Sequence, residues 1–230
     1  MANWDVRKQS LEALHGPLEA LAGQLDGVLK IIDDCIRVCE AEKADSYLTA
    51  CAVTMLKGKR FGMCQYSLIL DGYAQEAGAC SRPFLEYWEL LIYLRLDPSR
   101  HKLMPDKLPT AGVIAKEIGS EYKFYRDYLN NHASHKSFSE SSIGHLGDDS
   151  QQLKLMPSFS ESWLKFNLRF LFGVLLQFAR ESIIAIQTHF PGKVDKQTVA
   201  FEIHRELSRD FLEKTFDEKP KQSPSGLFSS

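Results

Sequence analysis

Apolar residues recur along most of the chain at the 3.6-residue spacing of an α-helix, and alternating patterns typical of strands are few. The first such segment extends from about Leu11 to Glu42 and is interrupted at Gly16-Pro17. One face of this segment carries an apolar stripe made of Leu18, Leu21, Leu25, Val28, Leu29, Ile32, Ile36 and Cys39. The pattern predicts an all-α protein.

Two further helices are predicted in the first half of the chain. Asp45 or Ser46 is a suitable N-cap for a helix over residues 47–70, which ends at Asp71-Gly72. The next helix, over residues 74–96, has too many apolar positions for a single stripe, so we expect it to be covered on several sides. Residues 98–109 contain three prolines and are predicted to form a loop.

The second half of the chain predicts further helices and one less regular region. Thr110 is expected to cap a helical region that reaches about His132, with a break near Gly119-Ser120. A small β-hairpin is predicted within residues 142–156, a long helix over 160–190 and an amphipathic helix over 196–216. We therefore expect a bundle of six to seven helices, a single helical domain over residues 1–216 and a disordered tail over 217–230.

The charge balance argues against a nucleic-acid-binding protein of the usual strongly basic kind. Twenty-eight Lys and Arg residues against 30 Asp and Glu residues give a net charge of −2. A local excess of Lys and Arg between Arg95 and Lys136, interleaved with aromatic residues, leaves a small RNA-facing surface as an alternative to ordinary core packing. The prediction is RNA as a candidate partner and no DNA.

The five cysteines and the apolar segments suggest a reducing cytoplasm. The cysteines are odd in number and contain no C-x-x-C pair, which is typical of small buried groups rather than disulfides or metal ligands. The polar residues after Trp4 predict no signal peptide. The apolar run from Phe170 to Ala179 is about half of the ~20 residues that a membrane span needs, so we expect no membrane contact.

An ordered series of residues between Tyr47 and Leu96 resembles a known family. The series comprises Lys57-Gly58-Lys59-Arg60, the segment from Ser67 to Ala77, Ser81-Arg82-Pro83-Phe84-Leu85-Glu86, and Tyr93-Leu94. It is similar to the bacterial helical family named domain of unknown function 5677. The downstream match involves Tyr125, Leu129, Asn130 and either His132 or His135, with Asn130 where the family tends to have Ser. The resemblance implies a helical fold and a role in bacterial stress or phage defence, without a settled activity.

Arg126, Asp127 and His132 form a second pattern, which resembles the Arg-polar-x(4–6)-His signature of the HEPN superfamily. That resemblance implies metal-independent RNA cleavage, in which Arg126 holds the scissile phosphate and His132 transfers a proton. The spacing alone carries no weight, because Arg95 and His101 repeat it in a predicted loop. The alternative is a helix C-terminus that favours cationic side chains.

Arg82 and Glu86, four residues apart on a predicted helix, are candidates for a polar centre together with Tyr125 and His135. Their alternative role is a structural ion pair. His132 and His135 have ligand-like spacing, but no nearby Cys or Glu reinforces it, so we expect no metal and no other cofactor. The leading interpretation is a helical interaction or ligand-binding module. The alternative is a HEPN-like ribonuclease that uses Arg126 and His132. A homodimer is expected because the helix over 160–190 is too apolar to be covered within one chain.

Overall fold

The computed structural model describes residues 3–42, 45–122, 126 and 157–192. The predicted hairpin at 142–156, the helix at 196–216 and the tail at 217–230 lie outside these residues.

The described residues are almost entirely helical. They form α1 (Asn3–Leu14), α2 (Glu19–Ala41), α3 (Ser46–Leu70), α4 (Ala74–Leu96), the short 3-10 helix η1 (Pro98–Leu103), α5 (Ala111–Glu117) and α8 (Glu161–Gln187). No strand occurs among these residues. The predicted all-α fold is therefore confirmed for the described part of the chain.

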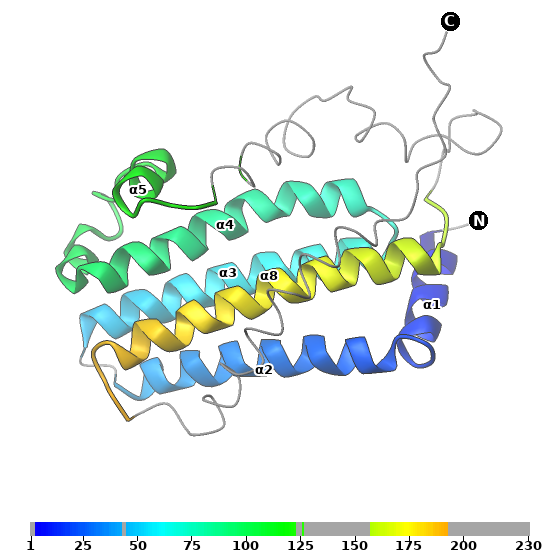
Figure 1. The fold of residues 1–230 in the computed structure, drawn as a ribbon, viewed down its shortest axis with the longest axis horizontal. Helices are drawn as coiled ribbons and strands as arrows, with labels where there is room; N and C mark the ends of the chain where they lie inside the picture. Colours follow the sequence, from blue (N-terminus) through cyan, green and yellow to red (C-terminus); the bar gives the residue numbers. More distant parts are fainter. Residues whose placement is uncertain (1–2, 43–44, 123–125, 127–156, 193–230) are drawn as a thin grey trace, which may run out of the picture.

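Four long helices, α2, α3, α4 and α8, lie side by side as a bundle, with α1 near one end and α5 against α4 (Figure 1). Helix α8 packs against α2, α3 and α4, and its inner face supplies many of the buried side chains. The largest fully buried residues come from all four helices: Leu25, Ile32, Leu48, Met55, Phe84, Leu91, Leu168 and Phe178. One continuous apolar core holds the bundle together.

The start and end signals of the predicted helices are largely confirmed. The Asp45 side chain accepts a hydrogen bond from the backbone N–H of Leu48 at 2.9 Å, as an N-cap does. Ser160 caps α8 by accepting from the backbone N–H of Trp163. Gly72, with φ of +83°, follows the C-terminal end of α3, where only glycine adopts this conformation without strain. Local signals therefore set these boundaries.

Two glycines let α3 and α8 approach closely. A Cβ atom built on Gly58 would overlap the ring of Phe178, and one on Gly62 would lie 2.7 Å from Cδ2 of Leu175. The small residues at these positions therefore leave room for large side chains of α8. This contact fixes the spacing of the two helices at the middle of the bundle.

Helix α1 begins at Asn3, eight residues before the predicted start at Leu11. Its inner face carries Val6, which is buried, and Arg7, which bonds to the C-terminal end of α3. The Arg7 guanidinium donates to Asp71 Oδ2 at 2.7 Å and to Ser67 Oγ at 2.6 Å. The prediction missed these first two turns because a long-range ion pair, rather than an apolar stripe, ties them to the bundle.

Helix α8 is long and apolar enough to cross a membrane by length and composition alone, but 67% of its most apolar window is buried inside the bundle. Such burial is compatible with a core helix. Contacts with α2, α3 and α4 cover much of α8 within one chain, so its apolar character alone does not require a homodimer. Dimerisation therefore stays a prediction that needs another surface.

Candidate functional site

Glu89 of α4 is a carboxylate in the interior, with a relative exposure of 1%. It lies on a helix that is apolar on several sides, between the buried residues Trp88 and Leu90. Ser120 Oγ donates a hydrogen bond to Glu89 Oε1 at 2.5 Å, and the Nη2 group of Arg126 donates to the same oxygen. A buried carboxylate needs such charged and polar partners to remain ionised.

The end of α5 brings these partners to α4. Gly119, with φ of +60°, follows the last turn of α5, and the backbone N–H of Ser120 bonds to the carbonyl of Ala115 at 2.9 Å. The chain then returns toward α4, where the Tyr122 ring packs against Trp88 with ring centroids 4.3 Å apart. The glycine turn therefore places Ser120, Tyr122 and Arg126 over the middle of α4.

A second buried carboxylate, Glu181, lies on α8. Arg95 Nε donates to Glu181 Oε2 at 2.9 Å, and Arg180 Nη1 lies 3.3 Å from Glu181 Oε1. Tyr122 lies close enough to both carboxylates for their charges to affect its pKa. Burial raises the pKa of Tyr122, the negative charges of Glu181, Glu121 and Glu89 raise it further, and Arg180 opposes them.

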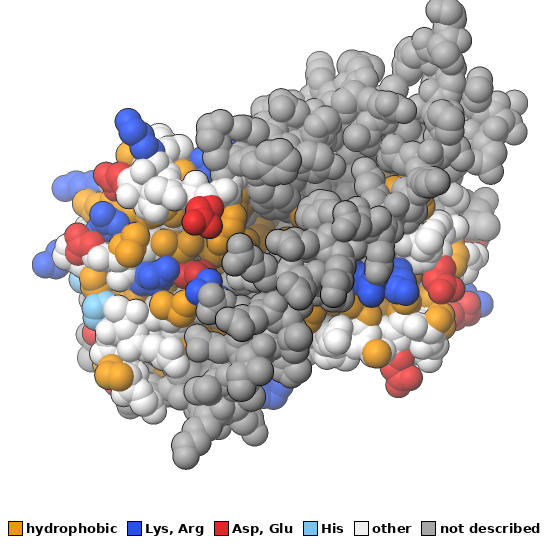
Figure 2. All heavy atoms as spheres, in the orientation of Figure 1, with side chains coloured by type: hydrophobic (Ala, Val, Ile, Leu, Met, Phe, Trp, Pro, Cys, Tyr) orange, Lys and Arg blue, Asp and Glu red, His pale blue; other side chains and the backbone are white. Residues whose placement is uncertain are grey.

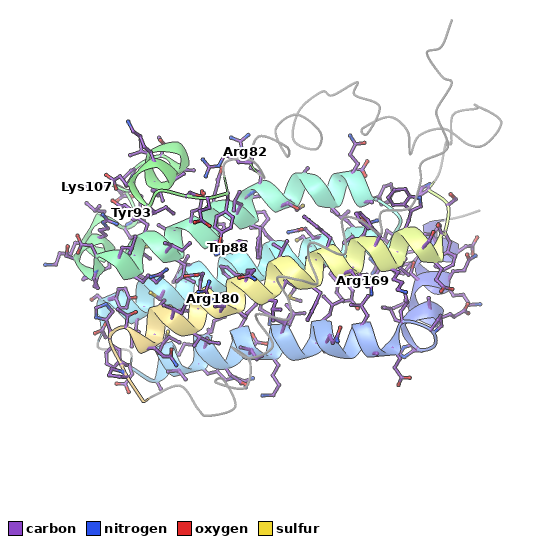
Figure 3. The ribbon with its side chains drawn as sticks, in the orientation of Figure 1. Arg82, Trp88, Tyr93, Lys107, Arg169 and Arg180 are labelled. Atoms are coloured by element: carbon purple, nitrogen blue, oxygen red, sulfur yellow. The ribbon has the colours of Figure 1, made fainter. Side chains whose placement is uncertain are left out.

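We call this cluster the charged centre. It consists of Trp88, Glu89, Arg95, Ser120, Tyr122, Arg126, Arg180 and Glu181. Three guanidinium groups accompany two buried carboxylates, so the charged centre has an excess of one positive charge. Figure 3 labels Trp88 on α4 and Arg180 on the neighbouring α8. The charged centre therefore spans the α4–α8 interface and the segment after α5.

Four polar atoms of the charged centre are buried and find no hydrogen-bond partner among the described residues. They are three N–H groups and one carboxylate oxygen: Trp88 Nε1, Arg126 Nε, Arg180 Nε and Glu89 Oε2. Leaving a buried polar group unpaired costs about 1–3 kcal/mol, so native structures contain few of them. Several in one cluster indicate positions for a bound molecule or for ordered water.

Of the predicted site residues that the structure describes, Arg126 belongs to the charged centre, whereas Arg82 and Glu86 do not. Arg126 is part of it, but its carboxylate partner is Glu89 rather than Glu86. Arg82 and Glu86 form a pair with Nε and Oε1 3.5 Å apart, and their side chains are 40% and 39% exposed, as in an ordinary surface ion pair. Tyr125, His132 and His135 lie outside the described residues, so the distance from Arg126 to either histidine stays open.

Sequence reasoning did not single out Trp88 and Glu181 as site residues, and it considered Glu89 only as a neighbour of Glu86, one turn further along the helix. A signal for them exists, because each carboxylate lies in an otherwise apolar stretch of a long helix, Trp88-Glu89-Leu90-Leu91 and Glu181-Ser182-Ile183-Ile184. A lone charged residue in such a context is either buried with a partner or part of a site. The residues that pair with these carboxylates come from segments distant in the sequence, so no local sequence pattern identifies them.

The described residues contain no group of three or more His, Cys, Asp or Glu side chains arranged to hold a metal ion. The cysteines in the core are neutral thiols, since burial raises the pKa of Cys35 to about 12 and that of Cys51 to about 12. The guanidinium, carboxylate and hydroxyl groups of the charged centre form hydrogen bonds and ion pairs. Comparisons of the chain with protein-family models, with curated proteins and with solved structures give no match.

Proposed function

We propose that this chain is a helical ligand-binding module whose ligand occupies the charged centre. The observation that carries the proposal is the set of unpaired buried atoms on Trp88, Glu89, Arg126 and Arg180. A purely structural ion-pair network is stable only when its members satisfy one another. Here the pairs formed by Glu89 and Glu181 leave donors and an acceptor unused.

The unused atoms define the chemistry of the ligand. Three N–H groups call for acceptor oxygens, and the excess positive charge favours an anionic group such as a phosphate or a carboxylate. Glu89 Oε2 calls for a hydrogen-bond donor, which a hydroxyl group on the same ligand would supply. A small molecule that carries both an anionic group and a hydroxyl group offers the kinds of partner that these four atoms lack.

The exposure of the arginines supports access from solvent. The side chains of Arg126 and Arg180 are partly exposed, whereas those of Glu89 and Glu181 are buried. The cations therefore lie on the solvent side of the charged centre and the carboxylates on its inner side. An anionic ligand would meet the guanidinium groups first.

The proposal is tested by the thermal unfolding midpoint of the full chain with glycerol 3-phosphate, with inorganic phosphate and with glycerol at matched ionic strength. A ligand that binds only the folded state raises the midpoint as its concentration exceeds Kd. We expect the largest increase with glycerol 3-phosphate, and a smaller one in the variant Trp88→Phe, which lacks the indole N–H. The control Lys30→Gln, on the exposed face of α2, should respond as the wild type does. No increase with any of the three probes would contradict the proposal.

A ribonuclease that uses Arg126 and His132 stays the alternative proposal. Its support is the resemblance to the HEPN signature, in which the polar Asp127 follows Arg126 in a predicted helix. The ion pair of Arg126 with Glu89 weighs against it, because that carboxylate competes with a phosphate for the guanidinium group. In the face shown in Figure 2, Lys, Arg, Asp and Glu side chains of the described residues are interspersed with apolar ones rather than gathered by sign. RNA degradation by the wild type and not by His132→Ala would favour the nuclease. A cytoplasmic role in bacterial stress or phage defence is the setting that the family resemblance implies.

A further inference from the structure

Helix α1 has an outer face that nothing in the described part of the chain covers. Trp4 is 78% exposed on this face, and Leu11 is also exposed. The opposite face is buried through Val6, Ser10, Ala13 and Leu14. A large aromatic side chain held in water beside an exposed leucine, on a helix whose opposite face is buried, points to an interaction surface.

The outer face is a continuous stripe. At 100° per residue, Trp4, Lys8, Leu11, Glu12 and His15 fall within an arc of about 100° on one side of the helix. Together with Arg7 they border a shallow depression that is largely open to solvent.

The charges along the stripe are arranged for self-association. Lys8 and Glu12 lie one turn apart and point the same way, with Nζ and Oε1 4.0 Å apart. If two copies of α1 pair antiparallel through their outer faces, about a two-fold axis at a level midway between Lys8 and Glu12, Lys8 of each copy lies opposite Glu12 of the other. An interface between identical copies requires this kind of self-complementarity.

The same register gives the apolar residues suitable partners. The two Leu11 side chains would meet near the axis, and each Trp4 would come near the turn after α1 of the other copy, where Gly16 and Pro17 are exposed. Glycine leaves room for an indole ring, and proline offers it an apolar surface. The charged pairs and the apolar contacts are therefore compatible with the same antiparallel pairing of two α1 helices.

From this agreement we infer that the outer face of α1 binds a second copy of this chain, through antiparallel pairing of Trp4, Lys8, Leu11 and Glu12. Figure 1 places α1 near one end of the bundle, so the pairing joins two bundles at these ends. A helix of 12 residues is about 18 Å long. Its face buries less than the ~800 Å² per partner of a standard interface, so the dimer is weak and depends on protein concentration.

The test is sedimentation velocity of the full chain over a concentration series at low ionic strength. We expect the wild type to shift from monomer to dimer as concentration rises. Lys8→Glu places like charges opposite each other and should weaken the dimer by ~10-fold or more in Kd, which corresponds to ~1.4 kcal/mol. The double variant Lys8→Glu with Glu12→Lys restores complementarity and should dimerise nearly as the wild type does.

A matched control uses the exposed ion pair of α2. Lys30 and Asp34 are also four residues apart, and the swap Lys30→Glu with Asp34→Lys should leave dimerisation unchanged. Helix content by circular dichroism verifies that every variant is folded. A wild type that stays monomeric, a dimer insensitive to Lys8→Glu, or a double swap that fails to restore it would each overturn the inference. A membrane partner would also overturn it. In that case the tryptophan fluorescence shifts to the blue on vesicles of phosphatidylcholine and phosphatidylglycerol, while the sedimentation coefficient does not change with protein concentration.

Discussion

The guanidinium group of Arg126 donates a hydrogen bond to Glu89, a carboxylate that is 1% exposed and 37 residues away along the chain. This contact ties the segment after α5 to the middle of α4. It also assigns to Arg126 a carboxylate partner inside the protein. The charge of Arg126 is therefore partly compensated in the unliganded protein.

Breaking this pair should cost stability. Removing one partner of a buried ion pair typically costs ~3–5 kcal/mol, and the partial exposure of Arg126 places Arg126→Ala near 2–3 kcal/mol. The double variant Glu89→Leu with Arg126→Met removes both charges and should be closer to the wild type than either single variant. Urea unfolding measures these differences. The control Arg82→Ala breaks a surface pair and should cost at most ~0.5 kcal/mol; equal losses from Arg82→Ala and Arg126→Ala would contradict the burial argument.

Two glycine substitutions should have opposite effects on stability, because only one of them adds a methyl group to the close contact between α3 and α8. Gly58→Ala places a methyl group against the Phe178 ring and should destabilise the protein by ~1–3 kcal/mol, since an overpacked core strains side chains and backbone. At Gly27 of α2 an added Cβ meets nothing within 4 Å. Gly27→Ala should therefore stabilise the helix by ~0.5–1 kcal/mol. Thermal unfolding distinguishes the two, and a neutral Gly58→Ala would show that the helices separate without cost.

The fold could be predicted from the sequence because apolar spacing and capping residues are local. The ends of α3 and the start of α8 follow from Asp45, Gly72 and Ser160 within a turn. The site could be predicted only in part. Glu86 and Glu89 lie on the same helix, three residues apart, and choosing between them requires knowing which face of α4 meets Arg126. That choice depends on packing between distant segments, which periodicity along one helix does not encode.

The buried thiols predict a loss of stability at alkaline pH. Burial raises the pKa of Cys35, Cys39 and Cys51 to about 12 in the folded protein, whereas an unfolded chain releases these protons near pH ~8.5. Above that pH the unfolded state binds fewer protons, so the free energy of unfolding decreases as pH rises toward 12. Each thiol contributes a slope of ~1.4 kcal/mol per pH unit within this window.

The measurement is urea unfolding between pH 8 and 11. Cys51→Ala should reduce the slope of stability against pH, after allowance for the methyl-sized loss of packing at every pH. Cys64 is exposed, so Cys64→Ala should leave the slope unchanged. Alkylation by iodoacetamide at pH 8 should modify Cys64 well before the three buried thiols. Rapid labelling of Cys35 in the folded protein would contradict its burial.

The contact of Arg7 with Asp71 and Ser67 predicts that its loss opens α1 locally and does not unfold the whole bundle. Arg7→Ala removes the bonds to Asp71 and to Ser67 at the end of α3. Amide hydrogen exchange should then accelerate in α1, because few other contacts hold this helix, while the cores of α3 and α8 stay protected. Uniform acceleration throughout the bundle would show that this contact supports the whole fold.

The central claim is that the unpaired atoms of the charged centre bind a small hydroxylated anion. A high-resolution crystal structure of the protein with glycerol 3-phosphate tests it most directly. The account predicts phosphate oxygens within hydrogen-bond distance of Trp88 Nε1 and of an arginine Nε, with a hydroxyl group donating to Glu89 Oε2. Electron density for water molecules alone at these atoms, at saturating ligand, would contradict it.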